Sequence, residues 1–446
     1  MPHYDLKRPE MTSRKRKKLV YAETDGKVYL VRDGGKLRFP GDGEKIPFKV
    51  EKLATMRLSE ADVEMVRPLL DRHPDEWLWR DDALERDDVD SVVKNAIYMT
   101  MMRCVAEVAA VEGDKVLMVK AKRGFSVGYW NLPGGFMQYG ELPEIACARE
   151  FKEETGVDVA VDDTIGVYVS TFPEKPAYTL GFVYRGRVLS KEFRPKEDEI
   201  EKVDWQLFDH GLELTRNPFA KWGIVDLYRQ LPEKQANINV HRHGLLKSRE
   251  PSGGKGPVVF LDRDGVINKG VPGYLKTWRE FKFLPGAVDA MKSLCDGGYR
   301  LAIVTNQDVM GWKILSHEGL RKIHDNMLKD LAKNGVRIEE IYYCPHNLMS
   351  QCRCHKPQPA MLLAAARDLG VSPRQAWMVG DKVSDVVVGK HFGCWTIWIA
   401  DAKRRKRYEA DARGARPDFT FEDLAGAANA IRETDMSKLI YRAKEL

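Results

Sequence analysis

The chain has 446 residues, of which 43% are apolar and 31% are charged, and its net charge is 72 − 66 = +6. This length predicts two or three domains, and this composition supports packed cores and excludes global disorder. No apolar run approaches the roughly 18 residues that a membrane-spanning helix needs. The first twenty residues lack the apolar segment of a secretory signal. We therefore expect a cytoplasmic protein without a membrane partner.

Two basic runs concentrate part of the positive charge. Residues 14–18 read RKRKK and residues 403–407 read KRRKR. Neither run has the interleaved aromatic residues or the motif of a nucleic-acid binder. The runs are typical of solvated segments and are compatible with anionic substrates. We expect phosphorylated small molecules as binding partners and do not expect nucleic acid, while the sequence leaves the oligomeric state open.

The expected elements divide the chain into four parts. Residues 1–97 form a small N-terminal region whose role stays unassigned. Residues 98–234 combine strands with a glycine-rich loop and one clear helix. Residues 235–255 are polar and glycine-rich, which predicts a linker. Over residues 256–446 strands alternate with helices, which predicts a parallel α/β sheet.

The N-terminal region carries short strand-like runs separated by turn sequences. Residues 18–21, 27–32 and 36–39 predict a small β-meander. Residues 59–72 are expected to form a helix. No residues in this region form a recognisable catalytic pattern, so the sequence predicts no activity for it.

A carboxylate-rich helix is expected within residues 135–157, which read GFMQYGELPEIACAREFKEETGV. Pro143 is a favourable first helical residue and Gly156 a natural end. Three glutamates then lie at i, i+3 and i+4 on one face: Glu150, Glu153 and Glu154. Such like charges repel unless a cation neutralises them, and oxygen ligands of this kind suit Mg²⁺ or Mn²⁺.

The residues around this helix complete a longer pattern. Seven positions follow the spacing G-x5-E-x7-R-E-φ-x-E-E-x-G-φ, with φ apolar: Gly135, Glu141, Arg149, Glu150, Glu153, Glu154 and Gly156. At ordinary residue frequencies this match has a chance probability on the order of 10⁻⁸ per start position. The pattern resembles the box of the Nudix hydrolase family without a departure, over roughly residues 98–232.

The Nudix resemblance implies an α/β/α sandwich that hydrolyses a nucleoside diphosphate linked to another group. It implies that Glu150, Glu153 and Glu154 bind the metal ions, with Glu153 also counted as catalytic. Arg149 would orient one of these carboxylates through a charge-assisted hydrogen bond. Water would attack phosphorus while Mg²⁺ or Mn²⁺ neutralises the charge that develops on the diphosphate.

The substrate of this domain is less defined. Pro173 lies sixteen residues past the box, where Nudix members that act on ADP-ribose often carry a proline. This resemblance favours an ADP-ribose or ADP-sugar-like substrate, and nucleotide-sanitising triphosphatase activity is the alternative. Glu199 could serve as a general base or an extra ligand, and it could equally be a surface charge.

A second constellation begins where the apolar segment 257–261 runs into Asp262 and Asp264. Two carboxylates at the C-terminal end of a strand lie where α/β sheets hold their ligands. Further polar residues follow in this order: Thr305, Lys356, Asp381 and Asp385. The sequence D-x-D, then Thr, then Lys, then G-D-x-x-x-D resembles the haloacid dehalogenase (HAD) superfamily.

The HAD resemblance implies a role for each of these residues. Asp262 would attack phosphorus and form an aspartyl-phosphate, and Asp264 would protonate the leaving alcohol and then activate water. Thr305 and Lys356 would hold the transferring phosphoryl group. The expected Mg²⁺ ligands are Asp262, Asp264 and Asp381.

Four neighbouring residues complete this expected site. Asp385 would support the metal or its loop without touching the substrate. Three polar residues next to the catalytic positions are expected to bind the substrate: Arg263, Asn306 and Lys382.

A cysteine-rich loop precedes Lys356. Cys344 and His346 are followed by Cys352 and Cys354. Three thiolates and one imidazole make a closed tetrahedral Zn²⁺ site, which is structural rather than catalytic. Because Lys356 lies two residues after the last thiol, a bound Zn²⁺ would hold the loop that presents this lysine.

This loop narrows the HAD resemblance to one group. Further matching segments are residues 262–268 (DRDGVIN), 273–274 (GY) and 283–286 (FLPG). Over roughly residues 256–432 the chain resembles the histidinol-phosphate and heptose-bisphosphate phosphatases, which carry the zinc loop instead of a large cap. His355 departs from the usual C-x-C-R-K-P, and the loss of that guanidinium puts strict transfer of either substrate in doubt.

The sequence thus predicts an α/β protein with three parts: a small N-terminal region, a Nudix sandwich, and a capless Rossmann-like HAD domain with a zinc loop. The expected function is a bifunctional hydrolase that cleaves a nucleoside diphosphate derivative and a phosphomonoester, in sequence or separately. Alternatives are a Nudix triphosphatase joined to a histidinol-phosphate phosphatase, a nucleic-acid end-processing phosphatase, and a regulatory module with decayed sites.

Overall fold

The computed structural model describes residues 16–24, 27–58, 61–70, 76–100, 103–122, 127–138, 141–171, 178–232, 238–246, 256–401 and 416–434. The chain forms two compact units, the first built mainly from Met1–Arg103 and the second mainly from Cys104–Leu439. The second unit contains two domains, here called the middle domain (residues 104–232) and the C-terminal domain (residues 238–434). In the described part of the chain, no helix is both long enough and apolar enough to cross a bilayer.

The N-terminal unit contains a five-stranded sheet in the order β5-β6-β1-β2-β7, and β3 and β4 pair separately. Its elements are β1 (Lys17–Thr24), β2 (Lys27–Val28), β3 (Val31–Asp33), β4 (Lys36–Arg38), β5 (Lys49–Arg57), β6 (Ala61–Leu69), β7 (Leu78–Trp79), α1 (Arg80–Glu85) and α2 (Ser91–Thr100). The strands predicted at residues 18–21 and 36–39 are present as β1 and β4. The strand predicted at residues 27–32 is wrong as a single element, because β2 and β3 form there and belong to different sheets. The core includes Tyr21, Phe39 and Ile97.

The helix predicted over residues 59–72 is wrong where the structure describes this segment. Residues Ala61–Leu69 form β6, which pairs in parallel with β1 and antiparallel with β5. Ala61 and Val63 are buried while Asp62 and Glu64 are only partly buried. This alternation has the period of a strand, and pairing along both edges outweighs the weak helical preference of so short a segment.

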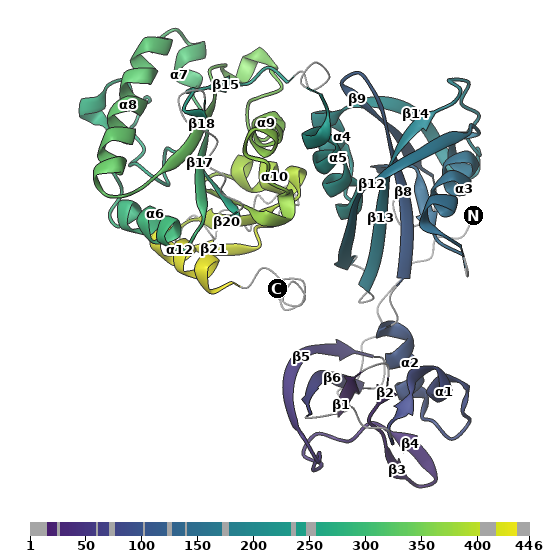
Figure 1. The fold of residues 1–446 in the computed structure, drawn as a ribbon. Coiled ribbons are helices and arrows are strands. Elements are labelled where there is room, and N and C mark those ends of the chain that lie inside the picture. Colours follow the sequence, from purple (N-terminus) through teal and green to yellow (C-terminus); the bar gives the residue numbers. More distant parts are fainter. Residues whose placement is uncertain are drawn as a thin grey trace, which may run out of the picture. The chain divides into compact units, whose positions relative to one another are not determined.

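The middle domain is a sandwich of strands and helices (Figure 1). Its elements are β8 (Arg103–Glu112), β9 (Lys115–Ala121), β10 (Trp130–Asn131), β11 (Gly134–Phe136), α3 (Pro143–Thr155), β12 (Val159–Thr171), β13 (Tyr178–Val188), β14 (Ile200–Leu207), α4 (Phe208–Leu214) and α5 (Pro218–Gln230). The strand order is β10-β9-β8-β13-β12, with β11 on β8 and β14 on β9. Ala106 and Val108 of β8 share a core cluster with Phe151 of α3.

The C-terminal domain has a seven-stranded sheet in the order β15-β18-β17-β16-β19-β20-β21. The strands are β15 (His241–Arg242), β16 (Val258–Leu261), β17 (Arg300–Asn306), β18 (Ile338–Cys344), β19 (Ala376–Gly380), β20 (Trp395–Ile399) and β21 (Phe419–Phe421). The main helices are α6 (Ala287–Asp296), α7 (Asp308–Gly311), α8 (His317–Lys333), α9 (Ala360–Leu369), α10 (Val383–Phe392) and α12 (Leu424–Glu433). β16 pairs in parallel with β17 and β19. The carboxyl ends of these three strands therefore meet at one edge of the sheet.

Part of the segment predicted as a linker belongs to this sheet. His241 and Arg242 form β15, which pairs antiparallel with Tyr343 and Tyr342 of β18. The buried carboxylate of Glu340 accepts hydrogen bonds from the backbone N–H groups of residues 244 and 246, at 3.0 and 3.2 Å. The polar composition of this segment is thus compatible with an edge strand whose backbone is bonded on one side. Residues 235–237 and 247–255 of the expected linker lie outside the described residues, as do Pro173 and the basic run at 403–407.

The middle and C-terminal domains contact each other within the second unit. Asp209 of α4, 3% exposed, pairs with Arg353, whose Nε donates at 2.7 Å and whose Nη2 makes a second bond. Three more hydrogen bonds run from α5: Lys221 Nζ to Lys390 O (2.6 Å), Trp222 Nε1 to Gly393 O (3.0 Å) and Arg229 Nη2 to Gly370 O (2.7 Å). Because Arg353 lies between two predicted zinc ligands, this ion pair joins the cysteine-rich loop to the middle domain.

Candidate active sites and metal centre

The first candidate site lies on the helix of the middle domain. α3 begins at Pro143 and ends at Gly156, which adopts a φ of 77° that favours glycine. Phe151 is buried in the core. The predicted glutamates lie on other faces of the helix, where Glu153 keeps 48% of its side chain exposed.

Arg149 organises most of these carboxylates. Its Nε and Nη2 donate to the two oxygens of Glu141 at 2.8 and 2.9 Å, and its Nη1 donates to Glu150 at 2.7 Å. The same Nη1 lies 3.5 Å from Glu153 Oε1. Hydrogen bonds from Arg149 and from the backbone of Gln138 lower the pKa of Glu141 to about 2. One guanidinium thus holds three carboxylates of the pattern in a defined orientation.

Two consecutive glycines of β11 make room for the remaining contacts. A Cβ on Gly135 would lie 2.5 Å from Glu150 Oε2, so a larger residue there would displace this carboxylate. The N–H of Gly134 donates to Glu154 Oε2 at 2.9 Å. Burial raises the pKa of Glu154 to about 8 and also raises that of Glu150. Buried carboxylates of this kind fit a hard divalent cation, which would compensate their charge.

A further buried carboxylate lies beside this site and is not part of the sequence pattern. Glu107 of β8 is 6% exposed and pairs across the ladder with Gly134. Its Oε1 accepts from Asn217 Nδ2 at 2.6 Å, while within the described chain its Oε2 has no hydrogen-bond partner. Burial raises its pKa to about 7. The sequence signal that could have identified Glu107 was a single glutamate inside an otherwise apolar strand. Glu199, the other candidate, pairs with Lys196 at 2.7 Å.

The second candidate site lies at the carboxyl edge of the C-terminal sheet. Asp262 follows β16, and its Oδ1 lies 3.0 Å from Lys356 Nζ. The same Nζ contacts Asp385 Oδ1 at 2.6 Å and donates to Val304 O at 2.7 Å. Burial lowers the pKa of Lys356, but the charges of Asp262 and Asp385 outweigh it and raise this pKa overall. The lysine is therefore a buried permanent cation beside the predicted nucleophile.

Three buried aspartates of this site can hold one metal ion. Carboxylate oxygens of Asp262, Asp381 and Asp385 all lie within 4.8 Å of one another. This set fits Mg²⁺, which binds carboxylate oxygens. Asp262 and Asp381 of this set are predicted ligands, and Asp385 is predicted to support the metal or its loop. Asp264 is not in the set, so its part in metal binding stays a prediction.

The carboxylate of Asp264 points instead into a hydrogen-bond network. It accepts bonds from Arg263, Asn268 and Gln307. Burial alone would raise the pKa of Asp264, but the positive charge of Arg263 and these hydrogen bonds lower it to about 2. Neither Asn268 nor Gln307 was predicted as a site residue, because their contacts with Asp264 arise only from tertiary packing.

The predicted substrate-binding residues have different surroundings. Arg263 is 1% exposed, and its guanidinium is engaged by protein groups. Asn306 accepts from the backbone N–H of Lys356 at 2.9 Å and donates to its carbonyl at 3.1 Å. Lys382 is exposed as a whole residue. Partial burial of its amine lowers its pKa, but the charges of Asp262 and Asp381 raise this pKa overall. Of the three, only Lys382 has a free approach to a ligand, and its role in substrate binding stays a prediction.

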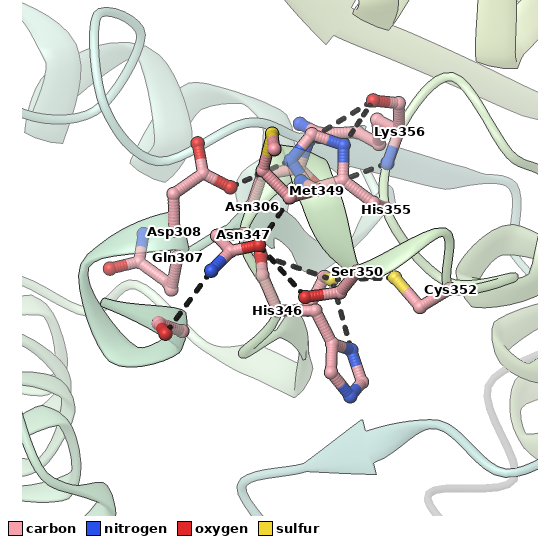
Figure 2. Close-up of polar contacts among 12 residues, drawn as sticks. Asn306, Gln307, Asp308, His346, Asn347, Met349, Ser350, Cys352, His355 and Lys356 are labelled. Atoms are coloured by element: carbon pink, nitrogen blue, oxygen red, sulfur yellow. Dashed lines mark hydrogen bonds and ion pairs between the residues drawn. The ribbon is translucent and has the colours of Figure 1, made fainter. Parts of the chain in front are cut away.

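Thr305 and His355 complete the surroundings of Lys356. Thr305 ends the buried part of β17, and its Oγ1 accepts from Gln307 at 3.0 Å. Nε2 of His355 contacts Asp308 Oδ1 at 2.7 Å, and Nδ1 lies 2.9 Å from the carbonyl oxygen of Lys356 (Figure 2). His355 therefore bonds to protein groups at the position where the resemblance stated above leads us to expect an arginine.

The cysteine-rich loop brings its four predicted ligands together. The three sulfurs of Cys344, Cys352 and Cys354 lie 3.4–3.6 Å apart. Nδ1 of His346 lies 3.6 Å from Cys344 Sγ and 3.3 Å from Cys354 Sγ. A tetrahedral Zn²⁺ with Zn–S bonds of about 2.3 Å would place its sulfurs roughly 3.7 Å apart. The cluster therefore fits a structural Zn²⁺, and Asn347 anchors the loop to Gly311 O at 3.2 Å (Figure 2).

Known family models match parts of the middle and C-terminal domains. The family model of the NUDIX domain matches residues 102–227, and a HAD-hydrolase-like model matches residues 353–427. The first match contains α3 and its glutamates. The second begins inside the cysteine-rich loop and includes Lys356, Asp381 and Asp385.

Individual relatives match the C-terminal domain. The chain is 38% identical over 138 residues to a D-glycero-beta-D-manno-heptose-1,7-bisphosphate 7-phosphatase of Pasteurella multocida, covering 30% of this chain and 74% of the relative. It is 39% identical over 180 residues to the D-glycero-alpha-D-manno-heptose-1,7-bisphosphate 7-phosphatase of Mycobacterium tuberculosis, covering 39% and 90%. A D,D-heptose 1,7-bisphosphate phosphatase structure from B. bronchiseptica aligns with a TM-score of 0.37 and 29% identity, over 39% of this chain and 97% of that one.

Proposed function

Because the chain contains a Nudix domain and belongs, through its C-terminal domain, to the heptose-1,7-bisphosphate 7-phosphatase family of HAD hydrolases, we propose that it has two distinct phosphate-cleaving activities. The C-terminal domain removes a phosphate from a sugar phosphate. The middle domain hydrolyses a nucleoside diphosphate joined to a sugar-like group. The observation that carries the first activity is the 3.0 Å contact between Lys356 Nζ and Asp262 Oδ1.

The residues of the C-terminal site suit a two-step phosphoryl transfer. Asp262 attacks phosphorus, and Lys356 and Thr305 hold the oxygens of the phosphoryl group. Asp264 handles the protons of the leaving alcohol and of the attacking water. Asp262, Asp381 and Asp385 would hold Mg²⁺, which would offset the repulsion between carboxylate and phosphate. The family of the matched relatives supports a sugar phosphate over histidinol phosphate as the substrate.

Asp262→Asn tests the phosphatase activity. We expect this variant to lose release of inorganic phosphate from heptose 1,7-bisphosphate or a hexose bisphosphate by on the order of 10³ or more, because the amide is not a nucleophile. The matched control is cleavage of the diphosphate substrate by the same variant, which should be unchanged. Histidinol phosphate belongs in the same assay, and its preferential hydrolysis would overturn the choice of a sugar phosphate.

The middle domain supports diphosphate cleavage through its ordered carboxylates. Arg149 fixes Glu141, Glu150 and Glu153, and Glu154 is buried against the N–H of Gly134. These groups can bind and orient a divalent cation that neutralises diphosphate charge. We assign an ADP-ribose or ADP-sugar substrate, on the resemblance at Pro173. Nucleoside triphosphate hydrolysis is the competing outcome.

Glu154→Gln tests the diphosphate-cleaving activity, just as Asp262→Asn tests the phosphatase activity. ³¹P NMR with ADP-ribose, ADP-sugars and nucleoside triphosphates in the presence of Mg²⁺ would follow each linkage directly. We expect Glu154→Gln to lose diphosphate cleavage and to keep phosphomonoester hydrolysis. Conversion of triphosphates alone by the wild type would assign the competing activity.

The two reactions can form a sequence. Hydrolysis of an ADP-sugar yields AMP and a sugar phosphate, which is a phosphomonoester of the class that Asp262 would attack. In a time course with an ADP-sugar, we expect the sugar phosphate to rise and then fall as inorganic phosphate is released. With Asp262→Asn the sugar phosphate should accumulate. A sugar phosphate that persists in the wild type would show that the two activities are independent.

A further inference from the structure

The carboxylate of Asp264 accepts four hydrogen bonds. Its Oδ1 accepts from Asn268 Nδ2 at 2.9 Å and from Arg263 Nε at 3.3 Å. Its Oδ2 accepts from Arg263 Nη2 at 2.8 Å and from Gln307 Nε2 at 3.0 Å. An ionised carboxylate has about four acceptor sites, so this arrangement fixes its rotation completely. The longest bond, from Arg263 Nε, is the one most easily given up when Asp264 takes a proton.

Arg263 makes two of these bonds and therefore determines the position of the carboxylate. Its guanidinium is 1% exposed and cannot contact a substrate. Its Nη2 also donates to Gln307 Oε1 at 2.9 Å, and its Nη1 lies 3.1 Å from Nε2 of His324. A guanidinium offers its donors in one rigid plane. A partner at Nη1 therefore sets the orientation of the groups that face Asp264.

His324 is the partner that holds this plane from the side away from Asp264. It lies on α8 and is completely buried. The ring packs edge-on against His243, with centroids 5.6 Å apart, and against Tyr343, at 6.0 Å. Burial and the positive charge of Arg263 hold the pKa of His324 well below its ordinary value. The imidazole is thus neutral, accepts at Nε2 from Arg263 and carries its proton on Nδ1.

We propose that His324 is a positioning residue of the phosphatase site, which holds Arg263 so that the carboxylate of Asp264 is aligned for proton transfer. This inference rests on the phosphatase function proposed above for the C-terminal domain. His324 does not touch the substrate or the reacting atoms, and it acts only through Arg263.

The step most dependent on this alignment is hydrolysis of the aspartyl-phosphate. Water attacks phosphorus, its proton passes to the Asp264 carboxylate, and the bond between phosphorus and the Asp262 oxygen breaks. Inorganic phosphate leaves and Asp262 regains its carboxylate. Asp264 gives the proton to the leaving alcohol of the next turnover, or to solvent when the leaving group needs none. Because Arg263 keeps Asp264 ionised, the carboxylate is ready to act as the base in this step.

The test compares His324→Leu with His324→Gln. Leucine removes the acceptor for Arg263, whereas the side-chain oxygen of glutamine can replace it. The substrate is p-nitrophenyl phosphate, whose leaving group needs no protonation, so formation of the aspartyl-phosphate stays fast when Asp264 is misplaced. Rapid-mixing kinetics of the full-length protein would follow the release of p-nitrophenolate.

For His324→Leu we expect a burst of about one p-nitrophenolate per active site, followed by a steady rate about tenfold to a hundredfold below that of the wild type. His324→Gln should bring the steady rate back to within about threefold of the wild type and remove the burst. Arg263→Lys, which keeps the charge but loses the fork, should give the same burst as His324→Leu. Arg263→Lys keeps the proposal testable if the His324→Leu protein does not fold.

Two results would overturn the inference, and a third would concern only its premise. An unchanged steady rate in His324→Leu would exclude a positioning role. A lower rate without a burst, which glutamine does not restore, would indicate general damage to packing. Failure of the wild type to release p-nitrophenolate would instead contradict the proposed phosphatase function.

Discussion

His355 and Asp308 pair directly beside the lysine of the phosphatase site. Nε2 of His355 contacts Asp308 Oδ1 at 2.7 Å, and Asn306 holds the backbone of Lys356 from the other side. These bonds fix the loop that presents Lys356. They also occupy the imidazole, so that it offers little to a second phosphate on the substrate.

We therefore expect His355→Arg to improve the use of bisphosphorylated sugars. A guanidinium can bind a phosphate through two parallel hydrogen bonds, and a charge-assisted bond contributes about 1.5 kcal/mol or more. The ratio of kcat/KM for a sugar bisphosphate to that for the monophosphate should rise about tenfold. His355→Lys is the matched control, because it has the charge without the fork. Equal ratios in all three proteins would contradict this expectation.

At the scale of elements, β11 and α3 approach each other closely enough to require glycine. A side chain at position 135 would bring its Cβ to 2.5 Å from Glu150 Oε2. Glu150 in turn is held by Arg149 at 2.7 Å, so it has little freedom to move aside. The first glycine of the sequence pattern is thus explained by the space that a glutamate needs.

Gly135→Ala should displace Glu150 and lower diphosphate cleavage by about tenfold to a hundredfold, since misplacing one group of a catalytic arrangement has effects of this size. The phosphomonoesterase activity of the same variant serves as the internal control and should not change. Assays of both activities on one preparation would check this. Equal losses in both activities would indicate that the substitution acts through general unfolding.

The cysteine-rich loop connects the predicted zinc ligands to Lys356, the lysine that lies beside the predicted nucleophile. Cys354 and Lys356 are separated by His355 alone, and the loop is closed by four ligands. Removal of a bound Zn²⁺ would release this segment and loosen the position of Lys356.

We expect Cys352→Ser, or treatment with a strong chelator that is removed before Mg²⁺ is restored, to lower the phosphatase kcat by tenfold or more and to lower the melting temperature of the protein by several degrees. Diphosphate cleavage should fall much less, because Arg149 and the glutamates lie on α3. The measurement is zinc content by atomic absorption together with both activities. Zinc-free wild-type protein with full phosphatase activity would contradict the structural role of the cluster.

The sequence predicted those elements whose residues follow a recognisable spacing along the chain. The order of Asp262, Thr305, Lys356 and Asp381 follows from strands that end at one edge of a parallel sheet. The sequence did not predict β6, where a short segment takes its structure from its partners β1 and β5. It also did not predict the surroundings of Asp264, because Asn268, Gln307 and His324 meet it only through tertiary packing.

At the scale of the whole molecule, charged groups lie where the middle and C-terminal domains meet. Asp209 and Arg353 form an ion pair with two hydrogen bonds. Glu213, one turn further along α4, lies close enough to Asp209 to feel its charge. Burial, and then the charge of Asp209, raise the pKa of Glu213 from 4.5 to about 7.

This shift makes stability depend on pH in a definite direction. Between pH 4.5 and 7 the folded protein binds a proton at Glu213 that the unfolded chain releases. The contribution of Glu213 to the free energy of unfolding therefore falls as pH rises through this range and is constant above it. After allowance for solvent screening of this half-buried group, the change is on the order of 1 kcal/mol.

Glu213→Gln should remove this contribution, so that the variant gains stability relative to the wild type at pH 8 but not at pH 4.5. Urea unfolding at the two pH values would measure the difference. Glu192→Gln, at a side chain that is 82% exposed, is the matched control and should shift neither value. A gain of the same size at both pH values would contradict the assignment to Glu213.

The short strand β15 affects how an isolated fragment of the C-terminal domain would behave in solution. It covers β18, whose N–H and C=O groups would otherwise form an open edge of the sheet, and it brings the donors for the buried Glu340. A phosphatase fragment cut at residue 256, just before β16, would expose that edge. It would also remove two hydrogen bonds from the buried carboxylate of Glu340, which would keep the one from the N–H of Ile341 at 2.9 Å. Open edges recruit strands from other molecules. Such a fragment should self-associate, whereas one that starts before residue 238 should stay dispersed.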